Sequence, residues 1–343
     1  MKILITGGLG FIGSHTCSIL LKDGHHLVVI DDLSNSSVEV LSRLKFLSGN
    51  NLDFFKGSIL NKTLLNNVFQ KYKFETVIHF AGLKSVSESV HRPLDYYNVN
   101  VVGTISLLGA MKAHGTKKII FSSSATVYGS NSPLPYKETQ NNGKISNPYG
   151  KSKAIIEGII EDQAKIDKKF NAVILRYFNP IGAHESGLLG ECPNGPPNNL
   201  LPIILEVANK KRKYLSIFGN NYKTIDGTCR RDYIHVMDVA EGHINALNAD
   251  IKGFEIFNLG TGIPYSVLEV INCFEKINNL KINYKISKRR DGDLAEFWAD
   301  PLKANTTLEW FAKRDLDTMM LDSWKWQSKN PNGYKQLKSK KIK

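Results

Sequence analysis

The sequence contains no long apolar run. No stretch approaches the roughly 18 consecutive apolar residues that a membrane-spanning helix needs. The first apolar stretch, residues 3–5, ends at glycines, which makes it too short for a signal peptide and suits a first β-strand. Hydrophobic residues make up 42% of the 343 residues and charged residues 22%, as in soluble globular domains. We therefore expect a cytoplasmic protein that has no membrane contact.

Cysteine is also scarce, and its spacing excludes two classes of site. Cys17, Cys192, Cys229 and Cys273 stand far apart and form no closely spaced pair of the kind that binds zinc. A disulfide framework or a structural zinc site is therefore not expected, and the thiols suit a reducing compartment. We expect no bound metal.

Arginine clusters are few in a chain whose formal net charge is +13. Five of these charges are lysines of a short tail, residues 335–343, and removing them leaves +8. The other lysines are scattered among asparagines, without the interleaved aromatic residues of a nucleic-acid surface. We expect anionic small-molecule substrates, no nucleic-acid partner and a basic, disordered tail. No internal repeat of 20–50 residues is present, which excludes a solenoid or propeller.

Short apolar runs alternate with amphipathic stretches in the first half of the chain. The runs lie at residues 2–6, 27–31, 52–55, 76–80, 118–122 and 172–176. Apolar residues recur at helical spacing in residues 13–22, 64–72, 100–113 and 152–164. This rhythm predicts an α/β fold with a Rossmann-type, doubly wound parallel sheet.

The pattern changes beyond about residue 178. A loop rich in Gly, Pro and Asn covers residues 180–202, and irregularly mixed strands and helices follow it. We therefore expect two domains, a dinucleotide-binding domain at 1–178 and a smaller mixed α/β substrate domain at 179–334. Expected strands of the second domain are residues 215–218, 233–236 and 255–259, and expected helices are 236–249, 266–276 and 315–328.

A glycine-rich loop follows the first expected strand. Gly8, Gly10 and Gly13 match the Gly-x-Gly-x-x-Gly pattern, in which missing side chains let backbone amides approach a pyrophosphate at a helix N-terminus. With Gly7, the glycines can also be counted as Gly7, Gly10 and Gly13. Asp31 ends the second strand, where a carboxylate accepts hydrogen bonds from ribose hydroxyls and repels a 2′-phosphate. Because residues 32–37 contain no basic side chain, the loop predicts NAD and not NADP.

Tyr149 and Lys153 stand four residues apart on an expected helix, so both project from one face. A tyrosine that acts as a base near neutrality needs its pKa lowered by about 3 units from the free value, which costs about 4 kcal/mol. One ammonium at about 4 Å supplies about that much at an effective dielectric of about 20. The pair therefore predicts proton transfer by Tyr149 beside the Lys153 cation, to which the positive nicotinamide of bound NAD would add.

Together with Ser122-Ser123-Ser124-Ala125-Thr126-Val127-Tyr128-Gly129, these motifs resemble the extended short-chain dehydrogenase/reductase family. Within that family the chain is similar to the UDP-glucose 4-epimerases over nearly its whole length, to about residue 334. The closer similarity is carried by Arg-Tyr-Phe-Asn-Pro at 176–180, Pro-Asn-Asn-Leu at 197–200, Arg-Asp-Tyr-Ile-His-Val at 231–236 and Arg-Arg-Asp-Gly-Asp at 289–293.

The resemblance implies an isomerase that has bound NAD as a permanent group and acts on UDP-glucose and UDP-galactose. Tyr149 takes the proton of the sugar 4-hydroxyl while NAD takes the C4 hydride, and Ser124 donates or relays a hydrogen bond to the same oxygen. The 4-keto sugar turns over before the hydride returns. A homodimer formed through two helices of the first domain is also implied.

The resemblance implies two sets of ligand contacts, in which Arg231 and Arg290 bind the diphosphate and Asp293 the nucleoside ribose. The implied NAD contacts are Gly7, Gly10, Phe11, Ile12, Gly13, Asp31, Asp32, Ser34, Asn35, Ser36, Ser58, Ile59, Phe80, Ala81, Gly82, Lys84, Ser124, Tyr149, Lys153 and Phe178. The implied substrate contacts are Lys84, Ser124, Tyr149, Asn179, Asn199, Leu200, Arg231, Tyr233, Arg290, Asp293 and Phe297.

Three positions depart from the common pattern. Ser58 stands where relatives often have an aspartate that meets the adenine, and Val99 stands where an asparagine is common, so the NAD contacts there differ. Phe297 fills a position at the sugar pocket that is often tyrosine, or a small residue in members that accept N-acetylated sugars. A ring at Phe297 predicts exclusion of an acetamido group.

Three other classes share part of the pattern. Nucleotide-sugar 4,6-dehydratases follow the active-site hydroxyl residue with an Asp-Glu pair, whereas Ala125 and Thr126 follow Ser124 here. An NADP-dependent reductase would need a basic residue near Asp31. A non-catalytic NAD-binding sensor usually loses the Tyr/Lys pair, which this chain keeps. A turnover assay distinguishes the sensor from the epimerase.

Overall fold

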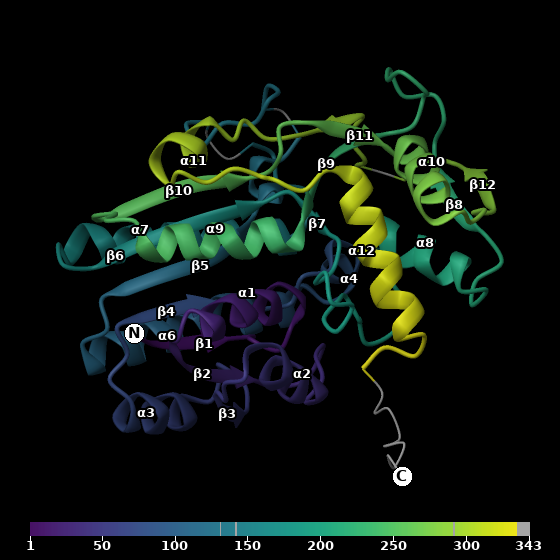
Figure 1. Ribbon diagram of the computed structural model, residues 1–343. Coiled ribbons are helices and arrows are strands. Elements are labelled where there is room, and N and C mark those ends of the chain that lie inside the picture. Colours follow the sequence, from purple (N-terminus) through teal and green to yellow (C-terminus); the bar gives the residue numbers. More distant parts are fainter. Residues whose placement is uncertain (131, 141–142, 291, 335–343) are drawn as a thin grey trace, which may run out of the picture.

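A seven-stranded parallel sheet forms the centre of the computed structural model (Figure 1). The structure describes residues 1–130, 132–140, 143–290 and 292–334, so the predicted basic tail lies outside the described residues. The strands run in the order β10-β6-β5-β4-β1-β2-β3. Their bounds are β1 (Lys2–Thr6), β2 (His26–Asp31), β3 (Asp53–Lys56), β4 (Thr76–His79), β5 (Lys118–Ser124), β6 (Asn171–Tyr177) and β10 (Phe254–Leu259). The prediction of a Rossmann-type α/β fold is confirmed.

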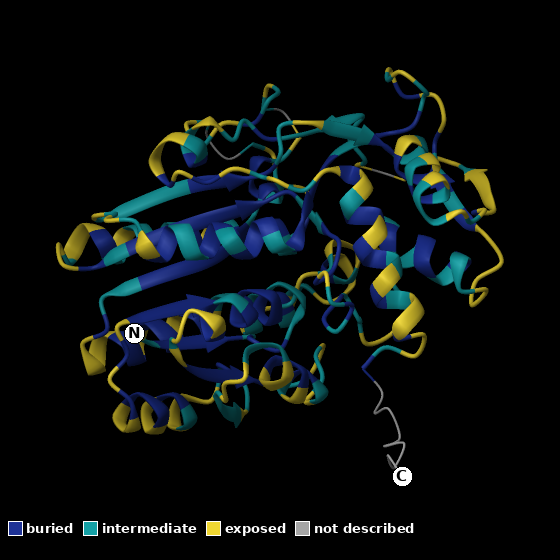
Figure 2. Ribbon diagram, in the orientation of Figure 1, coloured by how far each residue is buried: buried dark blue, intermediate teal, exposed yellow. Residues whose placement is uncertain are grey.

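Helices cover both faces of this sheet, because successive strand residues alternate between two apolar cores. Ile3 and Ile5 of β1 face one core and Leu4 faces the other. The first core is closed by α1 (Phe11–Lys22), α2 (Glu39–Ser48) and α9 (Val236–Asn248), and the second by α3 (Lys62–Lys71), α6 (Gly103–His114) and α7 (Pro148–Ile166). In Figure 2 the strands are buried along most of their length, whereas the outer faces of the helices are exposed.

Short helical segments connect β4 to α6 and β5 to the region before α7. α4 (Val86–His91), α5 (Pro93–Tyr96) and the π-helix η1 (Tyr97–Val102) precede α6, and the 3₁₀-helix η2 (Ala125–Tyr128) follows β5. Because strand order reverses on either side of β1, the ends of β1 and β4 form the topological switch point at which such sheets bind ligands.

The second domain contains two small sheets and its own apolar core. β7 (Asn179–Ile181), β9 (Arg230–His235), β11 (Pro264–Ser266) and β13 (Glu296–Phe297) form one sheet, and β8 (Leu215–Phe218) pairs with β12 (Tyr284–Ser287). The helices are α8 (Leu200–Ala208), α10 (Val267–Asn278) and α12 (Leu316–Lys329), and α11 (Leu302–Thr307) lies near β10. Ile204, Ile217 and Phe274 meet in the core between them.

The six strands predicted for the first domain lie within two residues of their observed bounds. The helices α2 and α8 were not predicted. The short elements α4, α5, η2, α11, β7, β11, β12 and β13 were also missed, because each has too few residues to show a period. No helix in the described ranges is both long and apolar enough to cross a membrane.

The chain returns to the first domain after it has entered the second. The sequence analysis assigns residues 236–259 to the second domain, but α9 packs on α1 and β10 pairs with β6 at the edge of the large sheet. The reason is long-range: Val239 and Leu247 of α9 complete the same core as Leu20 and Leu21 of α1. A single boundary after residue 178 therefore does not describe the arrangement.

A buried arginine on α2 joins the two domains. The Arg43 Nη1 atom donates to the Leu188 carbonyl and to Asn330 Oδ1, each at 2.8 Å. Its guanidinium carbon lies 4.8 Å from the ring centroid of Tyr334 and 5.4 Å from that of Trp326. Only 6% of Arg43 is exposed. This side chain therefore ties α2 to the end of α12.

We expect Arg43→Met to lower the free energy of unfolding by about 2–4 kcal/mol, since it leaves two buried acceptors without their donor. Urea denaturation measures this loss. The matched control is Arg92→Met, because the Arg92 side chain is 60% exposed and solvent screens its pairs with Glu88 and Asp95, so their loss should change stability much less. Equal losses in the two variants would contradict the role of Arg43.

Candidate active site

The glycine-rich loop between β1 and α1 lies at the topological switch point of the sheet, where its backbone is not covered by side chains. Gly7 has φ +70°, and a Cβ there would lie 2.7 Å from the Ala81 nitrogen. A Cβ at Gly13 would lie 2.4 Å from the Gly7 oxygen. Both positions therefore require glycine. α1 begins at Phe11 with no side-chain cap, so its first backbone N–H groups remain available to an anion. The loop fits a pyrophosphate.

Asp31, at the end of β2, is hydrogen-bonded to this loop. Its Oδ2 accepts the Leu9 N–H at 3.0 Å, and its Oδ1 accepts the Leu33 N–H at 2.9 Å and the Ser36 hydroxyl at 2.7 Å. A carboxylate offers about four acceptor positions, so about one remains for a ribose hydroxyl. The predicted ribose contact stays a prediction, and the structure adds a second role in fixing the loop.

The three predicted catalytic residues come together at the carboxyl end of the sheet. Ser124 ends β5, while Tyr149 and Lys153 lie on the first two turns of α7, which begins at Pro148 with the Asn147 side chain accepting the Gly150 N–H at 2.8 Å. Lys153 Nζ donates to the Ser122 carbonyl at 2.7 Å and lies 6.0 Å from the centroid of the Tyr149 ring. A hydrogen bond between the Ser124 hydroxyl and the Tyr149 phenol links the serine to the tyrosine.

Thr126 orients the Ser124 hydroxyl, a role that the sequence did not reveal. Ser124 Oγ accepts the Thr126 N–H at 3.3 Å and the Thr126 hydroxyl at 3.0 Å. Because both contacts occupy lone pairs of the oxygen, the Ser124 proton points away from Thr126 and is free to be donated. The available signal was the Ser-Ala-Thr spacing, which is typical of a hydroxyl that caps a turn.

Burial is the largest influence on the pKa values of Tyr149 and Lys153. It raises the pKa of the Tyr149 phenol, and the Ser124 hydroxyl only partly opposes that shift. Burial also lowers the pKa of the Lys153 ammonium to about 8, against the carboxylate of Glu157, which raises it. The Lys153 ammonium and the positive nicotinamide of bound NAD, which the sequence analysis expects to act together, therefore have to oppose the effect of burial on the phenol.

Two arginines of the second domain share one carboxylate. Arg290 Nε donates to Asp293 Oδ2 at 2.8 Å, and Arg231 Nη2 lies 3.7 Å from Asp293 Oδ1. Arg231 Nη1 also donates to the carbonyls of Arg230 and Leu294, each at 2.9 Å, which fixes its guanidinium near the start of β9. The three predicted diphosphate and ribose residues are therefore brought together. An anionic ligand would meet two guanidinium groups there.

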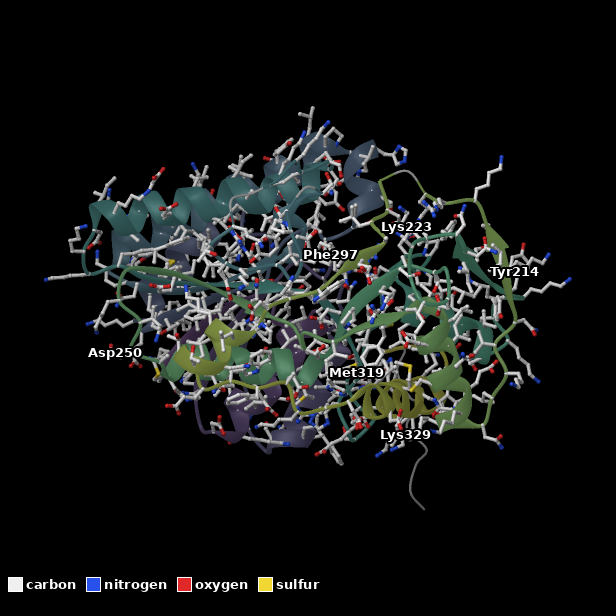
Figure 3. All side chains as sticks on the ribbon, turned by 90° about the horizontal axis from the view of Figure 1, so that it is seen from above. Tyr214, Lys223, Asp250, Phe297, Met319 and Lys329 are labelled. Carbon is white, nitrogen blue, oxygen red and sulfur yellow. The ribbon has the colours of Figure 1, made fainter. Side chains whose placement is uncertain are left out.

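Phe297 lies near the middle of the molecule, between the two domains (Figure 3). Its ring centroid is 4.9 Å from that of Tyr136 and 5.3 Å from that of Phe178. Tyr136 in turn stacks on Tyr128 at 4.9 Å with nearly parallel rings. The sequence missed Tyr136, because the contacts that bury it come from residues far along the chain. Phe297 thus lies in a cluster of aromatic rings, edge-on to Tyr136 and tilted against Phe178.

Other predicted contacts lie around these groups. Lys84 follows β4 and pairs with Glu191 at 2.9 Å. Phe80, Ala81 and Gly82 form the turn that closes on Gly7, and Ile59 and Phe178 are buried nearby. Asp32 Oδ1 accepts the Ser34 N–H, Asn194 bonds Ser34 and Asn35, and the Ser58 hydroxyl accepts the Leu60 N–H.

The predicted sugar contacts begin elements of the second domain. Asn179 starts β7, and Asn199 and Leu200 begin α8, where the Asn199 side chain makes no cap. Tyr233 is 5% exposed and belongs to the second-domain core, beside Arg231 on β9. These contacts remain predictions.

Two buried polar residues that the sequence did not single out support the site. Asp232 accepts N–H groups from Thr261, Gly262 and Ala299, which joins β9 to the segment that carries Phe297. Asn100, on η1, bonds both the N–H and the carbonyl of Leu83. Asp232 lies inside the Arg-Asp-Tyr motif, so its position was the available signal. Nothing in the local pattern marked Asn100.

The glycine loop, the parallel sheet and the Ser124, Tyr149 and Lys153 group define an extended short-chain dehydrogenase/reductase. The model of the family described as GDP-mannose 4,6 dehydratase matches residues 4–322. UDP-glucose 4-epimerase of Erwinia amylovora is 52% identical over 335 residues, which cover 97% of this chain and 99% of the relative. The Bacillus subtilis enzyme is 51% identical over 337 residues, covering 98% and 99%.

Solved structures agree. UDP-glucose 4-epimerase from Bifidobacterium longum in complex with NAD⁺ and UDP has a TM-score of 0.94 and 46% identity, covering 97% of this chain and 100% of that one. The chain therefore belongs to the UDP-glucose 4-epimerase family, within the wider group that includes the dehydratases. The predicted family is confirmed.

We expect Gly13→Ala to lose a bound dinucleotide, because the added Cβ would press on the backbone of Gly7 and Gly8 and open the loop. The measurement is the nucleotide released on denaturation of the purified protein, read by absorbance and chromatography. Gly109→Ala is the control, since a Cβ there meets nothing within 4 Å. Full nucleotide content in the Gly13 variant would show that the loop does not need its close contact.

Proposed function

We propose that the protein interconverts UDP-glucose and UDP-galactose with a permanently bound NAD. The observation that supports this most directly is the grouping of Ser124, Tyr149 and Lys153 at the end of β5, with the arginine pair of Arg231 and Arg290 in the domain that faces it. The first group handles a proton at a sugar hydroxyl, and the second suits a diphosphate.

The glycine loop and Asp31 fit the pyrophosphate and adenosine ribose of NAD. Bound there, NAD would supply reversible hydride transfer at sugar C4 and a positively charged ring near the phenol of Tyr149. The Asp31 carboxylate would accept a ribose hydroxyl, and no basic side chain follows it in residues 32–37, which favours NAD over NADP.

The protein's own residues then manage the proton. Tyr149 takes the 4-hydroxyl proton while Ser124 donates a hydrogen bond to the same oxygen, and Lys153 keeps a positive charge beside the phenol. After the 4-keto sugar has turned over, Tyr149 returns the proton to the oxygen at C4. Since the sugar itself must rotate, the firm hold has to be on the diphosphate, which is the role of Arg231 and Arg290. No electrons leave the site.

Dehydration is not favoured, although the matching family model takes its description from a dehydratase. Elimination of water needs an acid and base pair next to the active-site hydroxyl residue. Ala125 is buried there, and the Thr126 hydroxyl is used to orient Ser124. Neither side chain carries a carboxyl group, so the wider family's dehydratase chemistry has no acid at these two positions.

The test is incubation of the purified, NAD-containing protein with UDP-galactose and no added reductant, followed by chromatography of UDP-glucose. Tyr149→Phe should lower turnover by about 10²-fold or more while NAD stays bound, since it removes only the proton-transfer group. Tyr214→Phe is the control, because Tyr214 lies at the far edge of the second domain (Figure 3). Absence of turnover in wild type would refute the proposed function.

The sugar range follows from Phe297. A UDP-Glc/GlcNAc 4-epimerase from Campylobacter jejuni is 34% identical, with a TM-score of 0.82, so this fold also serves N-acetylated sugars in a relative. We propose that the Phe297 ring, held by Tyr136 and Phe178, leaves no room for an acetamido group. UDP-glucose and UDP-galactose are then the preferred substrates.

Phe297→Ala should raise kcat/KM for UDP-N-acetylglucosamine by about tenfold or more relative to UDP-glucose, because it opens space in the pocket. Steady-state kinetics on both sugars measure the ratio. Phe311→Ala, at an exposed position, is the control for loss of a ring. Comparable wild-type kcat/KM values for the two sugars would contradict the exclusion.

A homodimer is the proposed assembly. Leu94 of α5, Ile105 of α6 and Ile155 of α7 expose large apolar side chains on one side of the first domain, and 80% of Leu94 is exposed. Large apolar side chains exposed on neighbouring helices suit a surface that a second copy of the chain covers. Ile105→Glu should therefore shift the molecular mass in sedimentation equilibrium from dimer to monomer. An unchanged mass would place the contact elsewhere.

A cytoplasmic location is also proposed. All four cysteines are free, and Cys17 and Cys229 are buried as thiols, which suits a reducing compartment.

A further inference from the structure

A buried ion pair holds α7 to the strands beneath it. Glu157 lies one turn after Lys153 and two turns after Tyr149 on the same helix face. Its Oε1 accepts Arg176 Nε at 3.1 Å, and its Oε2 accepts Arg176 Nη2 at 2.6 Å. Their side chains are 5% and 3% exposed, respectively. The Ser123 hydroxyl also donates to Glu157 Oε1, at 2.5 Å.

These contacts fix the height of α7 over two strands. Ser123 of β5 and Arg176 of β6 are register partners, so Glu157 bonds both strands at one level. The residues on either side of Ser123 belong to the site: the Ser122 carbonyl accepts Lys153 Nζ, and Ser124 meets Tyr149. Sliding α7 along β5 would therefore separate Tyr149 from Ser124.

The charges around Lys153 leave Glu157 as the carboxylate that favours its ammonium. Tyr149 and Glu157 face it from α7, and His79 faces it from β4. The pKa of His79 is lowered to about 3 by burial and by Lys153 itself, so this imidazole is neutral. Arg176 on β6 is engaged with Glu157. The Glu157 carboxylate raises the pKa of Lys153 against the effect of burial.

We propose that Glu157 is a positioning residue for the reaction, which seats α7 against β5 and β6 and stabilises the Lys153 ammonium beside Tyr149. The inference rests on the proposed function. The competing explanation is a buried ion pair that serves stability alone, which is the ordinary role of such pairs. The two explanations differ in what happens to the pH dependence of turnover when the charge is removed.

The first variant is Glu157→Gln, which keeps the shape and one acceptor. Without the carboxylate, Lys153 loses its proton at lower pH, so the alkaline limb of the kcat profile should move to lower pH. We expect kcat to fall about tenfold and KM for UDP-galactose to stay within about twofold, since the diphosphate site is untouched. Glu157→Asp keeps the charge and should keep the alkaline limb near its wild-type position.

Glu157→Gln leaves Arg176 buried without its counter-charge and risks misfolding. The double variant Glu157→Gln with Arg176→Gln removes both charges and should restore stability while keeping the shifted limb. Asp238→Asn is the control, because it breaks an ion pair between the buried Asp238 on α9 and the half-buried Arg314. That variant should lose stability and keep the wild-type pH profile.

Nitrogen-15 NMR titration of the Lys153 ammonium in the NAD-bound protein separates this inference from the proposed function, since it needs no turnover. A lower Lys153 pKa in the Gln variants supports the inference even if wild type does not epimerise UDP-galactose. A Lys153 titration and a kcat profile identical to wild type in a folded double variant would overturn it.

Discussion

The hydrogen bond from Lys153 Nζ to the Ser122 carbonyl sets the geometry on which the rest of the site depends. It draws the catalytic helix against the end of β5, where Ser124 points into the same space as Tyr149. Because that contact is buried, burial lowers the pKa of the Lys153 ammonium and raises the pKa of the Tyr149 phenol. Burial thus opposes ionisation of the tyrosine, and the Lys153 ammonium together with the positive nicotinamide ring of a bound NAD would act against that effect.

The first domain carries the proton-transfer groups, and the second domain binds a substrate whose sugar must rotate. The first domain holds the proton-transfer groups on strand ends and on the first turns of a long helix, where backbone hydrogen bonds keep them in place. The second domain supplies Arg231 from β9, and Asp232 beside it braces the loop that carries Phe297. Since the substrate's sugar turns between two hydride transfers, a firm grip on the diphosphate and looser walls around the sugar satisfy both needs. Behind Phe297, Tyr136 meets its ring edge-on and stacks on Tyr128, so the position of the Phe297 ring is fixed by buried neighbours.

Much of this could be predicted from local signals. The strands of the first domain, the glycine loop and the Tyr149 and Lys153 pair depend on residue types at short spacing, and the structure places them as expected. The return of α9 and β10 to the large sheet could not be predicted, because it depends on which distant core accepts their apolar faces. Thr126, Asp232 and Asn100 were missed for a related reason, since each acts through backbone groups that only the fold brings near. The effect of burial on Tyr149 likewise needs the packed structure.

The late return of β10 has a consequence for how the chain acquires its structure during synthesis. Until Leu259 has left the ribosome, β6 has one side with free backbone donors and acceptors, and the core on the α1 face lacks α9. An open strand edge of that kind invites pairing with other chains. About three quarters of the polypeptide must therefore emerge before the nucleotide-binding half can close. Slower translation of the second domain would lengthen that exposed interval, and protection by a chaperone that covers strand edges would matter most within it.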